Sequence, residues 1–154
     1  MGVLDTLAQT LADTIDGMSV TFTDGNNASH TTAVKGYKWA PRDLDGAGPW
    51  GVIELPTVTR IGLDEAETQV GTKDWAVEFP VVFYIPLDEA AYAQALATAV
   101  VEDWLTAIDD NPFTADATVD DITVTDAGPA EIDADSSRPV VIYPTTVQLM
   151  KFVA

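Results

Sequence analysis

Residues 74–111 read DWAVEFPVVFYIPLDEAAYAQALATAVVEDWLTAIDDN, and this stretch predicts a strand that leads directly into a long helix. Up to Pro86, apolar side chains alternate with other residues, which is the period-two pattern of a half-buried strand. The alternating positions are Trp75, Val77, Phe79, Val81, Phe83 and Ile85. We therefore expect a strand with one apolar face in the middle of the chain.

The second part of this stretch has the spacing of a helix. Asp88 is a suitable N-cap, and Asn111-Pro112 ends the pattern because the residue before a proline is driven out of the helical region. A helix of about 22 residues would be about 33 Å long at ~1.5 Å per residue, which is enough to cross a small sheet. One apolar stripe is formed by Ala93, Leu96, Ala97, Val100, Trp104 and Ile108. We expect this stripe to pack on the sheet with Trp104 buried.

A shorter helical pattern stands near the start of the chain. Apolar residues recur at helical spacing from Val3 to Ile15, and Gly17 follows at the position of a C-terminal cap. This pattern predicts an amphipathic helix before the first strand. Four further segments have strand patterns: 18–23, 51–61, 119–125 and 140–153.

The sheet is expected to be less regular on one side. Residues 33–39 could form an edge strand within a segment rich in turn residues. Pro56 makes the 51–61 strand either an edge strand or a bulged one, because proline cannot donate a hydrogen bond to a neighbouring strand. The alternation in that strand places Ile53 and Leu55 on one face.

The chain of 154 residues is long enough for one hydrophobic core, and it has no visible repeat or linker. We predict a single domain over residues 1–154 of the α+β class. Its expected architecture is an antiparallel or mixed sheet with one long helix packed across it and an N-terminal amphipathic helix.

Acidic residues dominate the charge of the chain. Seven lysines and arginines face 25 aspartates and glutamates, for a formal net charge of −18. A surface that binds nucleic acid is therefore not expected, because it would repel the phosphates. Three interpretations stay open: a surface that keeps the protein in solution, adaptation to a salt-loving host, or a surface along which DNA slides without binding.

The densest basic cluster lies in the irregular segment before residue 50. Lys35, Lys38 and Arg42 alternate there with Tyr37 and Trp39. Solvated loop charges and protection of an exposed edge strand are the plain explanations. The sharper hypothesis is a subunit interface at which these five residues meet carboxylates of a neighbouring copy, since aromatic side chains and complementary charges are typical of interfaces.

The sequence has few of the groups that catalysis or metal binding requires. It has no cysteine, and its one histidine, His30, lies in a polar segment that we expect to be a loop. No phosphate-binding loop or nucleophile elbow is recognisable, and no run of eighteen apolar residues occurs. We therefore predict no catalytic, metal-binding or cofactor-binding residues, no bound cofactor, no membrane span, and a protein that is not an enzyme.

The order of the expected elements resembles a known family. An N-terminal helix of the Leu4-Leu7-Leu11 kind comes first, and VEFPVVFYIPLDEAAYAQALATAVVEDWL, residues 77–105, joins a strand to a long alanine-rich helix before two closing strands. In this pattern the chain is similar to the tail-terminator family of long-tailed viruses of bacteria and archaea, that is, to proteins of the minor tail protein U type. The resemblance implies a structural virion protein without catalytic residues.

What the resemblance implies about assembly is specific. Members of this family form a six-membered ring that caps the tail tube and joins it to the head-closure proteins of the neck. The implied partners are copies of the same chain, the tail tube protein and the neck proteins, while the genome passes through without specific binding. The implied location is the virion tail or neck, after assembly in the host cytoplasm. The alternatives are another neck or tail-tube ring protein and, from a different class, an acidic intracellular enzyme or ligand-binding domain.

Overall fold

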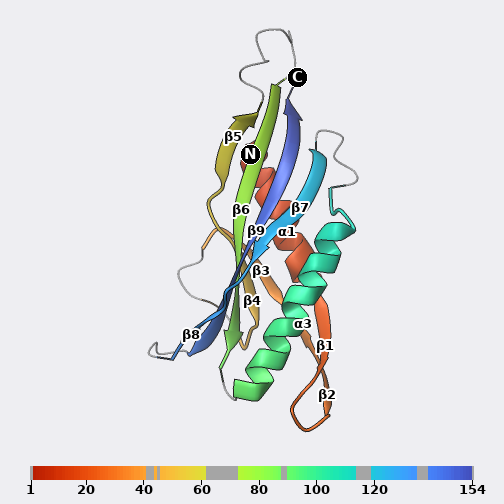
Figure 1. Ribbon diagram of the computed structural model, residues 1–154, viewed down its shortest axis with the longest axis vertical. Helices are drawn as coiled ribbons and strands as arrows, with labels where there is room; N and C mark the ends of the chain where they lie inside the picture. Colours follow the sequence, from red (N-terminus) through yellow and green to blue (C-terminus); the bar gives the residue numbers. More distant parts are fainter. Residues whose placement is uncertain are drawn as a thin grey trace.

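The computed structural model describes residues 2–40, 44, 46–61, 73–87, 90–113, 119–134 and 139–153 (Figure 1). The protein has the α+β class that the sequence predicts, with mixed helix and strand content and predominantly antiparallel pairing. Its elements in chain order are α1 (Val3–Asp16), β1 (Ser19–Thr23), β2 (Ser29–Ala33), β3 (Lys35–Lys38), β4 (Trp50–Ile53), β5 (Thr57–Ile61), β6 (Lys73–Pro86), α3 (Ala90–Asp109), β7 (Val119–Ala127), β8 (Glu131–Asp133) and β9 (Val140–Val153).

Two long antiparallel strands, β6 and β9, form the centre of the main sheet. They pair over their whole length, from Lys73 opposite Val153 to Pro86 opposite Val140. The sheet has the order β3-β4-β6-β9-β7, with β5 also on β6 and β8 also on β9. Strands β1 and β2 form a separate hairpin, which lies at the lower end of the molecule in Figure 1.

Each long strand is flanked by two short strands that are separated by a bulge. Between β4 and β5, residues 54–56 face only residues 79–80 of β6, and between β7 and β8, residues 128–130 face only residues 143–144 of β9. One extra residue in the flanking strand is the definition of a β-bulge. The sequence alternative of a bulged 51–61 strand is therefore confirmed.

Prolines in the two long strands explain where these bulges occur. The Pro80 carbonyl accepts the Glu54 N–H at 2.8 Å, and the Pro144 carbonyl accepts the Gly128 N–H at 2.8 Å. In an antiparallel strand the nitrogen and carbonyl of one residue point to the same neighbour. Each proline nitrogen, which has no hydrogen to donate, therefore faces a place where the neighbouring ladder is already interrupted.

Both helices lie on one face of the main sheet. Leu7, Leu11 and Ile15 of α1 share a single buried core with odd-numbered residues of β6 such as Phe83, and with Trp104 of α3. Helix α1 contacts β3 and β4, whereas α3 contacts β1, β6, β7 and β9. Even-numbered residues of β6 point to the opposite face, which neither helix covers.

Glycine permits the close approach of α1 to β3. A Cβ atom on Gly36 would lie 2.1 Å from the Ala12 carbonyl oxygen and 3.1 Å from the Asp16 nitrogen, both of which are backbone atoms of α1. The Gly36 N–H also donates to the Asp16 carboxylate at 3.2 Å. The helix therefore rests on bare strand backbone at this point.

Trp104 is fully buried, as the stripe predicts. It is 0% exposed, and its ring meets Phe83 edge-on at a centroid distance of 5.7 Å. Its indole nitrogen has no hydrogen-bond partner among the described residues. The N-terminal helix with its cap at Gly17 is also confirmed, while Asp88 lies outside the described residues.

Three details differ from the sequence expectations. Segment 51–61 is two strands, and the bulge between them leaves Leu55 77% exposed while Ile53 is fully buried, so the predicted shared face is wrong. Segment 33–39 is divided at Val34, which separates β2 from the edge strand β3. His30 lies in strand β2 and not in a loop. No helix within the described ranges is long and apolar enough to cross a membrane.

Candidate subunit interface

The residues predicted to form a subunit interface lie on and just after β3, at one edge of the main sheet. Strand β3 runs parallel to β4, with Lys35 opposite Trp50 and Lys38 opposite Ile53. The Lys35 N–H donates to the Pro49 carbonyl at 3.0 Å, and the Trp39 N–H donates to Ile53 at 2.9 Å. Arg42, the third predicted cation, lies outside the described residues.

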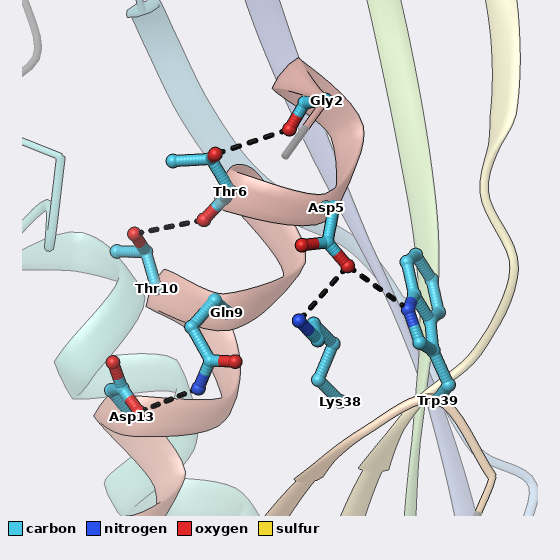
Figure 2. Close-up of polar contacts among 8 residues, drawn as sticks. All are labelled: Gly2, Asp5, Thr6, Gln9, Thr10, Asp13, Lys38 and Trp39. Carbon is cyan, nitrogen blue, oxygen red and sulfur yellow. Dashed lines mark hydrogen bonds and ion pairs between the residues drawn. The ribbon is translucent and has the colours of Figure 1, made fainter.

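Lys38 and Trp39 make contacts within their own chain. The Lys38 ammonium lies 2.9 Å from Oδ1 of Asp5, and the indole N–H of Trp39 donates to the same oxygen at 3.2 Å (Figure 2). The hydrogen bond from Lys38, aided by the one from Trp39, lowers the pKa of Asp5 below its usual value, although partial desolvation opposes the shift. These two residues therefore fasten the edge strand to the first turns of α1.

Sequence reasoning missed Asp5 as a member of this group. It lies 33 positions before Lys38, and nothing in the local pattern links the two. The available signal was its place on the helix: Asp5 lies two residues before Leu7, within the apolar pattern that runs from Val3 to Ile15, and a helix packed on the sheet by this pattern holds Asp5 near the sheet.

Lys35 is arranged differently from Lys38. Side chains alternate along a strand, and Gly36 and Lys38 are turned toward α1. Lys35 and Tyr37 therefore belong to the opposite face of the sheet, which the helices do not cover. Lys35 is exposed, whereas Tyr37 is half-buried and engaged in contacts of its own. Within the described part of the chain Lys35 forms no ion pair. The structure thus divides the predicted cluster into a fastened pair and an exposed lysine whose ammonium lies beside Gly46 of its own chain.

An apolar hollow lies beside this edge, at the β4–β5 bulge. It is lined by Trp39, Ala40, Glu54, Leu55 and Pro80 and has a volume of about 510 Å³. The bulge turns Leu55 outward, so the hollow lies next to the most exposed large apolar side chain among those described. Apolar surface of this kind is typical of contact sites.

The opposite edge of the sheet is acidic. Strands β7 and β8 form this edge, and their exposed side chains include Asp121, Asp126 and Glu131. Ile132 lies between Glu131 and the half-buried Asp133 and is 59% exposed. Lys35 and Lys38 are the only lysine or arginine side chains whose surroundings the structure describes, and both belong to the β3 edge. These two lysines and the carboxylates of β7 and β8 therefore lie at opposite edges of the sheet.

His30 belongs to a structural cluster at the β1–β2 hairpin. Its Nε2 lies 2.7 Å from Oδ2 of Asp24, and its ring stacks on Phe22 and meets Tyr92 of α3 edge-on. The hydrogen bond from His30, followed by the N–H groups of Asn26 and Ala28, lowers the pKa of Asp24. This arrangement closes the turn and ties the hairpin to α3.

No cluster of three or more metal-ligating side chains occurs among the described residues. Comparisons with known protein families and with curated proteins find no match to this chain.

Proposed function

We propose that this protein is a tail terminator, a structural virion protein that forms a ring, caps the tail tube and joins it to the neck. The observation that carries the proposal is the passage from β6 into α3. Strand β6 ends at Pro86 and α3 begins at Ala90, and α3 then contacts β6, β7 and β9 of the same sheet. One long helix packed across the sheet, directly after its central strand, is the arrangement that the resemblance implies.

The distribution of charge supports a ring. A chain with a net charge of −18 repels its own copies, so assembly is favoured where like charges are kept apart at the contacts or where the scarce positive charge lies there. The edge position of Lys35 satisfies this requirement. An acidic passage would also let DNA move through without being held, because phosphates are repelled by carboxylates.

The ring is the testable part of this proposal. The purified chain is examined by native mass spectrometry and by electron microscopy of negatively stained particles, in dilute and in molar salt. We expect closed rings of six copies with a central opening, favoured by salt because screening reduces the repulsion. A chain that remains monomeric at all salt concentrations contradicts the proposal, and open-ended tubes favour the tube-subunit alternative.

A further inference from the structure

We propose that the ring contact is made between the two opposite edges of the main sheet, with Lys35 of one copy meeting Glu131 and Asp133 of the next. This inference rests on the proposed function, since it names the two surfaces that close the ring. The occupant of the β3 edge is a second copy of this chain.

Lys35 and Glu131 lie in line across the sheet. Lys35 pairs with Trp50 of β4, which pairs with Tyr84 of β6. Tyr84 pairs in turn with Ile142 of β9, which pairs with Glu131 of β8. A single cross-strand row therefore runs from the lysine at one edge to the carboxylate at the other. Copies set side by side bring the positive end of one row to the negative end of the next.

Contacts between the two edges can close into a ring. A ring forms only from a head-to-tail contact between two different surfaces whose repetition returns to the first copy, whereas a displacement along the axis at each step gives an open helix. The two ends of the row are two such different surfaces, so their contact is of the head-to-tail kind.

The chemistry of the two edges favours a contact between side chains. The outward N–H of Gly36 is already bonded to Asp16, so β3 is not free to add a strand of its neighbour by backbone pairing at this point. Side chains must therefore make the contact. Lys35 is exposed, and its nearest basic neighbour Lys38 is held by Asp5. Glu131 and Asp133 lie on the same face of β8 as each other, whereas the exposed Ile132 points to the opposite face, because side chains alternate along a strand.

A charge-exchange series tests the contact. The variant Lys35→Glu, and separately Glu131→Lys with Asp133→Lys, should each weaken assembly at least about tenfold, because like charges then oppose each other. Combining all three substitutions should restore the rings. Gln94→Glu with Thr106→Glu, two exposed positions on α3, changes the net charge by the same amount as Lys35→Glu and should leave the rings intact.

Proximity is tested independently of stability, because the chain has no cysteine of its own. Lys35→Cys and Glu131→Cys are introduced singly and together, and a short bismaleimide is added. The double variant should give a ladder of covalent species up to six copies, and a mixture of the two single variants should give covalent dimers only. Neither single variant alone should yield a dimer, since a head-to-tail contact does not bring identical residues together.

The outcomes separate the two proposals. If the wild type forms rings and the Lys35→Glu variant forms them equally well, the proposed edge-to-edge contact is wrong. The same holds if rings form but the double cysteine variant gives no ladder of covalent species. In both cases the proposal that the chain forms a ring is unaffected. A wild-type chain without rings overturns the proposed function. Circular dichroism of each variant establishes that loss of rings is not loss of folding.

Discussion

Replacing Gly36 by alanine should loosen the attachment of α1 to the sheet. The added Cβ would lie 2.1 Å from the Ala12 carbonyl oxygen, whereas an ordinary contact is 3.4 Å or longer, so the helix backbone must move away by about 1.3 Å, the difference of the two values. The obstructing atoms belong to the helix backbone and cannot rotate aside. Overpacking of this kind costs about 1–3 kcal/mol.

For a domain of this size, 1 kcal/mol changes the melting temperature by about 2–4 °C, so Gly36→Ala should melt about 2–12 °C below the wild type. Urea unfolding followed by circular dichroism gives the free energy directly, provided that the denaturant slope is unchanged.

The matched control is Gly17→Ala, at the end of the same helix. A Cβ there meets its nearest atom at 3.5 Å, and the backbone is right-handed, so the change should be neutral or stabilising by about 0.4–1 kcal/mol. If Gly36→Ala is as stable as the wild type, α1 does not rest on β3 as described.

Three further predictions concern the core, the bulge and the acidic side chains. Trp104→Ala should destabilise the fold by about 3–5 kcal/mol in urea unfolding, since it empties a fully buried site; an unchanged midpoint would contradict its burial. Leu55→Ser should change the unfolding free energy by less than about 0.5 kcal/mol, whereas Ile53→Ala should cost about 2–5 kcal/mol, and equal effects would argue against the bulge. Because the pKa of Asp24 is lowered in the folded state, its contribution to stability is present above its unfolded value of 3.8 and is lost as the pH falls through the lower folded pKa. In a plot of melting temperature against pH, Asp24→Asn should therefore reduce the fall in melting temperature at acid pH. An unaltered fall would show that the hydrogen bond to His30 does not contribute to stability.

Sequence patterns predicted the elements that depend on local periodicity. The strand ending at Pro86, the buried Trp104 and the helix that ends before Gly17 all follow from apolar spacing within one segment. The exposed position of Leu55 could not be predicted in the same way. Pro56 indicated an edge strand or a bulge but not the position of the bulge, which lies opposite Pro80 of the partner strand, whose carbonyl accepts the Glu54 N–H.

The candidate interface was predicted only in part for a similar reason. The basic segment was found from composition, but composition does not distinguish Lys35 from Lys38. That difference depends on Asp5, which reaches Lys38 only because α1 packs on β3. The acidic edge at β8, which we propose as the partner surface, was also missed, because a short strand of three residues has no periodicity to detect.

The two central prolines also determine which errors the sheet can make while it folds. If β4 paired with β6 one residue out of register, a backbone carbonyl would face the Pro80 nitrogen, which has no hydrogen to donate. Every side chain of β4 would also point to the wrong face of the sheet. Pro144 imposes the same restriction on β7. Misaligned pairings are thus penalised on both flanks of the hairpin of long strands. Replacing these prolines with valine would give a sheet that pairs more freely and selects its alignment less reliably.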